Sequence, residues 1–118
     1  MAWEALFYET LSGRKPVAKF LRGLSAQAHG KCVKYIAMLQ EHGRLLPAQY
    51  LEKVRGELWA LRPEFGGNEY RIIFFHDDVS KKFVVVHAIQ KTSQRIPEDD
   101  ISTAESRMDD WNERQKIH

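Results

Sequence analysis

The stretch LWALRPEFGGNEYRIIFF, residues 58–75, carries the pattern that decides the fold. Two runs rich in aliphatic and aromatic residues flank a Gly-Gly turn, which is typical of antiparallel strands joined by a hairpin. A third run of this kind, KFVVVHAI at 82–89, follows the turn residues DDVSK. These runs predict a three-stranded antiparallel meander. Because each strand is apolar on both faces, we expect the sheet to be covered on both sides.

The N-terminal third of the chain predicts one strand and two helices. The short aromatic segment at 3–9 favours a strand. After Pro16, which a first helical turn accepts, residues 17–24 repeat apolar side chains at helical spacing. A second helical stripe begins after Ser25, a good helix cap, and ends at Gly43.

The C-terminal part adds a last helix. Pro97 is followed by three acidic residues, and negative charge stabilises the amino end of a helix. Residues 44–57 give no clear pattern. We therefore expect an α+β fold: an antiparallel sheet, made of the N-terminal strand and the three-stranded meander, with two N-terminal helices and one C-terminal helix. The length of 118 residues predicts a single domain, residues 1–118.

Charge is divided unevenly along the chain. Residues 1–95 hold 15 Lys and Arg against 9 Asp and Glu, whereas residues 96–118 hold 3 against 7. A basic body indicates a surface that binds an anion, although an ordinary charged helix face gives the same numbers. No apolar run approaches the roughly 20 residues of a membrane-spanning helix, and the N terminus lacks a signal-peptide pattern. We expect a cytoplasmic protein with no membrane partner, in which the lone Cys32 fills the core.

Two arginines stand in the apolar strands of the meander, where a charged side chain is unfavourable to bury. Arg62 ends the first strand and Arg71 begins the second, so the two should meet at one edge of the sheet. The third strand returns Lys91 to that edge, and His87 shares the face of Lys91 because residues four apart on a strand point the same way. Such a cluster suits a phosphodiester, since guanidinium groups match phosphate oxygens in pairs.

A purely structural interpretation of these residues stays open. Glu64 or Glu69, on either side of the turn, could pair with the arginines and simply close the hairpin. A lone histidine in a strand is more often a hydrogen-bonded core residue than a catalyst. A metal site is disfavoured, because there is one cysteine and the histidines lack ligand spacing. The Gly-Gly pair lacks the GK[ST] of a nucleotide-binding loop.

The quoted stretch, followed by FVVVHAIQKTSQRIP and a charged final helix, resembles the HigB-like branch of the RelE/ParE toxin superfamily, which is often phage-associated. The likeness covers nearly the whole chain and is densest over residues 53–97. It implies a RelE-like fold and the toxin of a type II toxin–antitoxin system. Such a toxin is a ribosome-dependent endoribonuclease that cleaves messenger RNA without a cofactor and inhibits translation. The implied partners are messenger RNA on the ribosome and a HigA-like helix-turn-helix antitoxin, through which alone the toxin would contact operator DNA.

Carried onto this sequence, the resemblance assigns catalytic roles. Arg62 and Arg71 match the arginines that hold the scissile phosphate, and Lys91 matches the basic residue after the last strand. Proton transfer would fall to Lys91 or His87, or to groups of the ribosome, because arginine is a poor base. The further candidates for RNA binding are Lys53, Arg55 and Arg95.

Three positions depart from the family pattern. Ala60 stands where an acidic residue is usual, Ile89 where Phe is common, and Thr92 replaces the second lysine of a pair. Two other functions therefore stay open. One is a non-catalytic toxin that binds RNA or protein, such as a ParE-like inhibitor of DNA gyrase. The other is a degenerate toxin that persists as a partner of its antitoxin.

Overall fold

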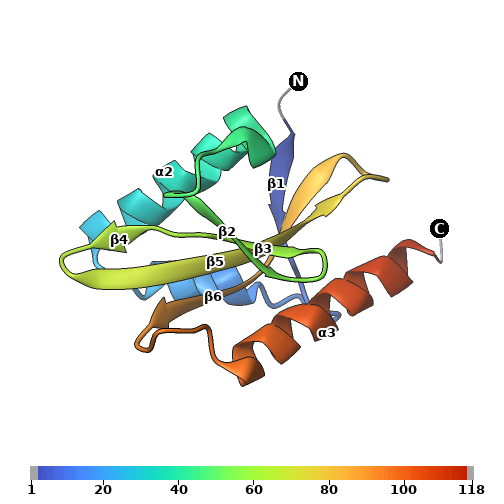
Figure 1. The fold of residues 1–118 in the computed structure, drawn as a ribbon. Helices are drawn as coiled ribbons and strands as arrows, with labels where there is room; N and C mark the ends of the chain where they lie inside the picture. Colours follow the sequence, from blue (N-terminus) through green and yellow to red (C-terminus); the bar gives the residue numbers. More distant parts are fainter. Residues whose placement is uncertain (1–2, 117–118) are drawn as a thin grey trace.

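In the computed structural model, which describes residues 3–116, a mixed sheet separates two helical layers (Figure 1). The first two and last two residues of the expected domain lie outside the described part. The elements follow in the order β1 (Glu4–Phe7), α1 (Pro16–Arg22), α2 (Ala26–His42), the 3-10 helix η1 (Gly43–Leu45), β2 (Leu51–Arg55), β3 (Leu58–Leu61), β4 (Glu64–Phe65), β5 (Asn68–Asp77), β6 (Lys82–Lys91) and α3 (Glu98–Gln115).

The sheet has the strand order β1-β6-β5-β3-β2, and the short β4 pairs with β5. Neighbouring strands are antiparallel except β1, which runs parallel to β6. The expected α+β class is confirmed, and the sheet is antiparallel as expected except at β1, which pairs with β6 in parallel. The expected set of strands is incomplete, because residues 44–57, which have no clear pattern, contain β2. Three charged residues among its five hide this strand, and charge is usual on an edge strand because it opposes pairing with other chains.

The hairpin at the centre of the quoted stretch is a two-residue turn. Phe65 pairs with Asn68 across it. Gly66 and Gly67 both adopt positive φ angles, 60° and 81°. Only glycine adopts this backbone freely, so the Gly-Gly pair fixes the register of β5.

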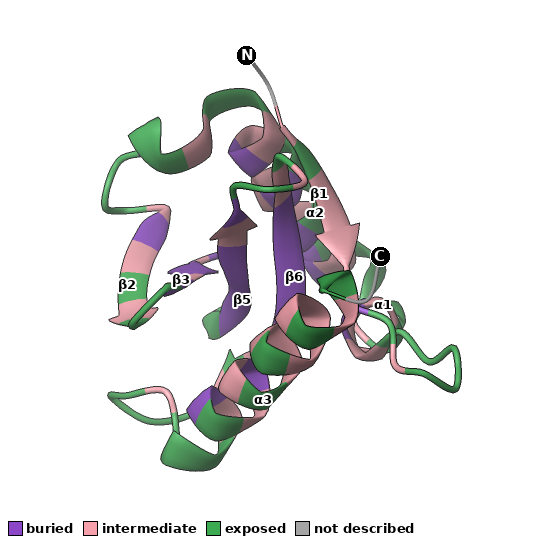
Figure 2. Cartoon of the chain, turned by 90° about the vertical axis from the view of Figure 1, so that its right-hand side faces the viewer, coloured by how far each residue is buried: buried purple, intermediate pink, exposed green. Residues whose placement is uncertain are grey.

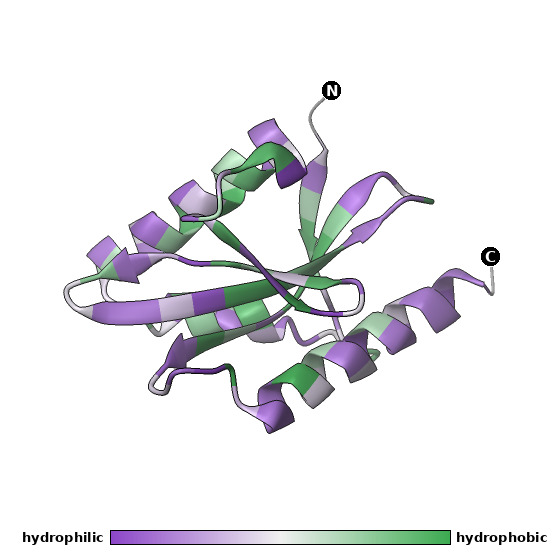
Figure 3. Ribbon diagram, viewed as in Figure 1, coloured by the Kyte–Doolittle hydropathy of each residue, from purple (hydrophilic) through white to green (hydrophobic). Residues whose placement is uncertain are grey.

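Two hydrophobic cores lie on opposite faces of the sheet, as the apolar strands predicted. Ile72 and Phe74 of β5 face the core beneath α1 and α2. The alternating Ile73 and Phe75 face the core beneath α3, and all four are at most 2% exposed. Figures 2 and 3 show the result: the central strands are buried and apolar, whereas the outer surface of α3 is exposed and polar. Each fully buried side chain of this size stabilises the fold by about 1.5–3 kcal/mol.

The helix boundaries follow the expected signals. The Ser25 hydroxyl accepts a hydrogen bond from the Ala28 amide at 3.2 Å, and Gly43 ends α2 with a φ of 59°. Helix α3 starts after Pro97, and its side chains Ile101, Ala104, Met108 and Trp111 pack in the core on its side of the sheet. Within residues 3–116, no helix combines the length and apolar character needed to cross a membrane.

Asp77 fastens the end of α3 to the sheet. Its carboxylate accepts hydrogen bonds from the Trp111 indole at 2.9 Å, the Ser80 hydroxyl at 2.7 Å and the Val79 amide at 3.2 Å. Burial acts to raise the pKa of Asp77, but these hydrogen bonds outweigh it, so the pKa lies below the usual 3.8. Ionised Asp77 therefore stabilises the native state at neutral pH.

Replacing Asp77 with Asn should lower the free energy of unfolding by about 1–3 kcal/mol at pH 7, because a buried acceptor of three hydrogen bonds loses its charge. A lowered native pKa contributes stability that is present above the unfolded value and lost as the pH falls through the native one. Urea unfolding at successive pH values should therefore show the difference between wild type and Asp77→Asn shrinking below about pH 4. The exposed neighbour Asp78→Asn serves as the control. An equal cost for both variants, or a difference independent of pH, would contradict this role.

Candidate functional site

The Arg71 side chain is buried in the sheet, with 1% of the residue exposed. Its Nε donates to Glu52 Oε1 at 2.5 Å, Nη1 donates to the Tyr70 carbonyl at 2.8 Å, and Nη2 donates to Glu69 Oε1 at 3.2 Å. The interpretation that Glu69 pairs with an arginine is therefore correct for Arg71. The expectation that Arg71 faces an open anion site is wrong, because acids on two strands already neutralise it.

Glu52 joins the two predicted arginines. Its Oε1 lies 2.5 Å from Arg71 Nε and 3.6 Å from Arg62 Nε. Arg62 is held by a hydrogen bond from Nη1 to the Ala48 carbonyl at 2.9 Å, and its buried Nε has no hydrogen-bond partner. The side chains of Glu52 and Arg62 are 34% and 38% exposed. The two arginines therefore meet at the Glu52 carboxylate. The guanidinium of Arg71 on one side of it is buried, and the guanidinium of Arg62 on the other side is partly accessible.

Glu52 was not among the predicted site residues, because it lies within residues 44–57, which show no clear pattern. It is the cross-strand partner of Ala60. Cross-strand partners share a face of the sheet, so Glu52 supplies a carboxylate beside the position at which an acid is missing from β3. The absence of the usual acidic residue at position 60 was a sequence feature that could have pointed to a carboxylate on a neighbouring strand.

Lys91 lies at the end of β6, directly opposite Glu69 on β5. It lines an open hollow of about 400 Å³ with Glu69 and residues 92–94. None of the ion pairs among the described residues involves Lys91. Glu69 therefore stands between the buried Arg71 and an available ammonium group.

His87 lies on the face expected for it, opposite Ile73, but both of its ring nitrogens are engaged. Nε2 lies 2.7 Å from Asp100 Oδ1, and Arg107 Nη1 donates to Nδ1 at 3.0 Å. Four residues of strand separate His87 from Lys91, roughly 13 Å, which is too far for both to serve one phosphodiester. The geometry gives His87 the task of anchoring α3 to β6.

The three further RNA-binding candidates do not join this cluster. Lys53 points to the opposite face of the sheet, where its ammonium lies 4.6 Å from the ring centre of Trp59. Arg55 pairs with Glu98 at 2.6 Å and Glu105 at 3.4 Å, both on α3. The hydrogen bond that Arg55 donates to the Glu98 carboxylate is the main cause that raises the pKa of Arg55.

Arg95 is exposed in the loop before α3, where its carbonyl accepts from the Ser93 hydroxyl at 2.7 Å. Among the described residues, no group of three His, Cys, Asp or Glu side chains gathers as a metal site would require.

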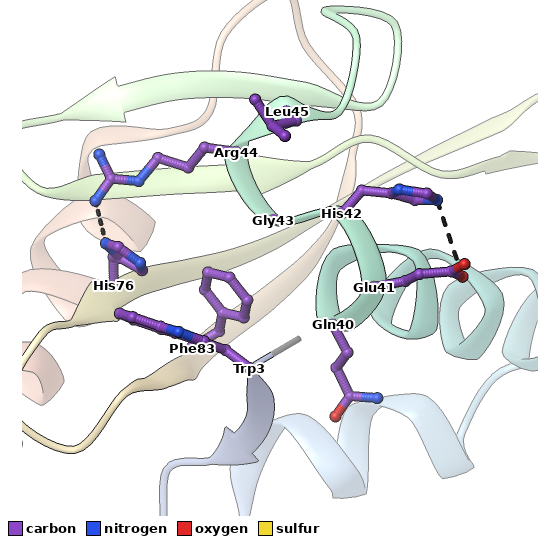
Figure 4. A pocket seen from close by; sticks show the side chains of 9 residues that line it. All are labelled: Trp3, Gln40, Glu41, His42, Gly43, Arg44, Leu45, His76 and Phe83. Carbon is purple, nitrogen blue, oxygen red and sulfur yellow. Dashed lines mark hydrogen bonds and ion pairs between the residues drawn. The ribbon is translucent and has the colours of Figure 1, made fainter. Parts of the chain in front are cut away.

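A second hollow, of about 400 Å³, lies on the other face of the sheet between the end of α2 and the β5–β6 hairpin (Figure 4). Trp3 stacks on His76 with 4.1 Å between ring centres, and Phe83 packs beside both. Burial and the nearby Arg44, which hydrogen-bonds the ring, lower the pKa of His76. His76 is therefore neutral at neutral pH and packs as an aromatic ring.

Two helices cover one face of the mixed sheet and one helix covers the other, which makes this an α+β protein. The chain is similar to Escherichia coli toxin RelE, solved in the free state with two arginines replaced by alanine. The TM-score is 0.63 at 19% sequence identity, over 91% of this chain and 98% of that chain. A search of curated proteins found no match.

Residues 19–109 match the family described as "Phage derived protein Gp49-like (DUF891)". The chain belongs to this family of Gp49-like phage-derived proteins. The expected RelE-like fold is thereby confirmed, and the family match agrees with the phage-associated branch that the sequence resembles.

Replacing Glu52 with Ala should lower the free energy of unfolding by about 3 kcal/mol, because it leaves the buried Arg71 without its nearest countercharge. Breaking a buried pair is typically worth about 3–5 kcal/mol, and Glu69 retains part of that here. The exposed Glu64→Ala should change stability by less than about 0.5 kcal/mol. Chemical denaturation of both variants measures the difference. Similar values would show that Glu52 does not neutralise Arg71.

Proposed function

We propose that this protein is a ribosome-dependent endonuclease toxin that cleaves messenger RNA without a metal or other cofactor. The observation that supports this proposal is the Glu52 carboxylate, which lies between Arg71 Nε at 2.5 Å and Arg62 Nε at 3.6 Å. A carboxylate oriented by one guanidinium, with a second guanidinium beside it, combines a proton acceptor with a phosphate-binding group.

The chemistry is an attack by the 2′-hydroxyl of the RNA on the adjacent phosphorus. A bond forms between the 2′ oxygen and phosphorus, and the bond between phosphorus and the 5′ oxygen breaks. Glu52 accepts the proton of the 2′-hydroxyl. Arg62 binds the phosphate oxygens, on which negative charge increases in the transition state. Lys91 donates a proton to the departing 5′ oxygen.

Arg71 acts in this scheme as a positioning residue. The resemblance implies that it holds the scissile phosphate, yet its three nitrogens already have protein partners. Its hydrogen bond to Glu52 Oε1 at 2.5 Å fixes the position of that carboxylate oxygen. When a phosphate engages Arg62, the weaker contact of Arg62 with Glu52 is the one that opens.

The partners proposed from the resemblance fit this geometry. A HigA-like helix-turn-helix antitoxin would neutralise the toxin by covering Arg62 and Lys91 with an acidic or apolar segment. Messenger RNA would reach the same surface on the ribosome, in the cytoplasm.

A non-catalytic toxin is the second candidate, and the full neutralisation of Arg71 by Glu52 and Glu69 is the observation that favours it. Such a protein would bind RNA, or a protein such as DNA gyrase, and inhibit growth without cutting message. Primer extension separates the candidates, because cuts within translated codons appear only if the protein is a nuclease.

In a translation extract, Glu52→Gln and Arg62→Ala should each lower the rate of message cleavage by at least about 10²-fold. Removing a general base or a stabilising donor typically has effects of this size. Primer extension over time measures the rate, with Lys34→Ala on α2 as the control for protein quality. Unfolding midpoints show whether a variant is folded. Cleavage at the wild-type rate by folded Glu52→Gln would exclude Glu52 as the base.

Arg71→Lys distinguishes positioning from phosphate binding. Lysine keeps the charge but loses the paired geometry of the guanidinium. If Arg71 positions Glu52, the variant should lower kcat and change the pH dependence of cleavage, while KM for programmed ribosomes stays the same. A rise in KM with kcat unchanged would instead show that Arg71 binds substrate.

A further inference from the structure

The excess positive charge of this protein lies away from the Arg62–Arg71 cluster. Residues 10–40 contain six Lys and Arg and no Asp or Glu. In residues 1–9 and 41–95 the two kinds of charge are equal in number, nine of each. The whole basic excess of the body is therefore in α1, α2 and the loop before them.

Four of these six cations gather at one groove between α1 and α3. The groove has a volume of about 560 Å³, and its lining includes Arg14, Lys15, Lys19, Arg22 and Arg107. Lys15, Lys19 and Arg22 are spaced by four and three residues, so they form a row along one side of α1. Arg107 lies on the opposite wall, on α3.

Arg107 is the half-buried cation of this set. It donates to the Val86 carbonyl at 2.8 Å and to His87 at 3.0 Å, and none of the ion pairs among residues 3–116 involves it. Burial lowers its pKa, which is the opposite of the effect of a carboxylate partner. Among the residues that the structure describes, the only ion pair made by a cation of the lining joins the exposed Lys15 to Glu9 at 3.7 Å. The positive charge of the groove is therefore mostly uncompensated by carboxylates, which favours the binding of an anion.

The groove also leads toward the proposed cleavage site. A neighbouring hollow, distinct from the one beside Trp3 and His76, shares Pro16, Lys19 and Arg107 with the groove. It reaches His87 and Ala88 of β6. Beyond its pairing with β1, which ends at Val85, this part of β6 is an edge. Lys91 lies three residues further along the same strand, roughly 10 Å away.

We propose that the groove between α1 and α3 binds the phosphate backbone of single-stranded RNA. The continuation of this strand along β6 to Lys91 rests on the proposed nuclease function. Arginine and lysine at regular intervals bind a polyanion without reading its sequence. A protein partner would be expected to insert large apolar side chains into matching pockets. The groove lining holds cations with Thr10, Gly13 and Pro16, and no large apolar side chain.

The test measures binding alone, so it succeeds or fails independently of cleavage. The probe is a fluorescein-labelled single-stranded RNA with methylated 2′-hydroxyls, which the proposed chemistry cannot cut. The test variant is Lys19→Gln with Arg22→Gln, two exposed positions at which folding should be unaffected. The control is Lys34→Gln with Lys116→Gln, which lowers the net charge equally at exposed positions outside the groove.

Anisotropy titrations over a series of salt concentrations give Kd and its salt dependence. The groove variant should bind at least about tenfold more weakly, and the slope of log K against log salt should fall by roughly 1.4, since each phosphate contact to a single strand contributes about 0.7. The control should stay within about twofold, because charge beyond about 10 Å is screened at 0.1 M salt. Equal losses in both variants, or no loss in the groove variant, would overturn the proposal. So would a polyglutamate peptide that binds more tightly than the RNA at equal salt.

Discussion

Arg71 puts a permanent positive charge in the interior of the sheet, and the arrangement around it follows from the need to compensate that charge. Removing an ion of this size from water is unfavourable by several kcal/mol unless it is paired and hydrogen-bonded. Glu52 from β2 and Glu69 from β5 provide this compensation, together with the carbonyl of Tyr70. The pairing ties the edge strand β2 to the centre of the sheet. It also fixes the Glu52 carboxylate beside Arg62, so the same contacts that allow the fold create the candidate site.

The distribution of charge separates two tasks on the molecule. At the Glu52 site two carboxylates, Glu52 and Glu69, face two guanidinium groups, Arg62 and Arg71. This equal number of charges suits a site where protons move and a phosphate must be exchanged. Along α1 the cations have few acids beside them, which suits retention of a long polyanion through many weak contacts. His87 and Arg107 lie between the two regions and hold α3 against β6. The position of α3 therefore determines both the width of the basic groove and the cover over the second core.

The sequence predicted the features that depend on local pattern. Apolar runs gave β3, β5 and β6, the Gly-Gly pair gave the hairpin, and Ser25, Gly43 and Pro97 gave helix ends that the structure confirms. The edge strand β2 was not predicted, because its three charged residues interrupt the alternation of apolar and polar side chains that marks a strand. The alternation of side chains along a strand placed His87 and Lys91 on one face, but it could not show that Glu52 would lie beside Ala60. Such a contact depends on which strand becomes the neighbour of β3, and no local signal encodes that choice.

The central claim is that Arg71 is a fixed internal partner of Glu52, whereas Arg62 is the guanidinium that meets the phosphate. Nitrogen-15 NMR of the arginine side chains tests this directly, with and without a 2′-O-methyl dinucleotide. The account predicts that the Arg71 Nε–H signal exchanges slowly with solvent and keeps its position, while the Arg62 Nε–H signal shifts on binding. A large shift of Arg71 with Arg62 unchanged would contradict the account.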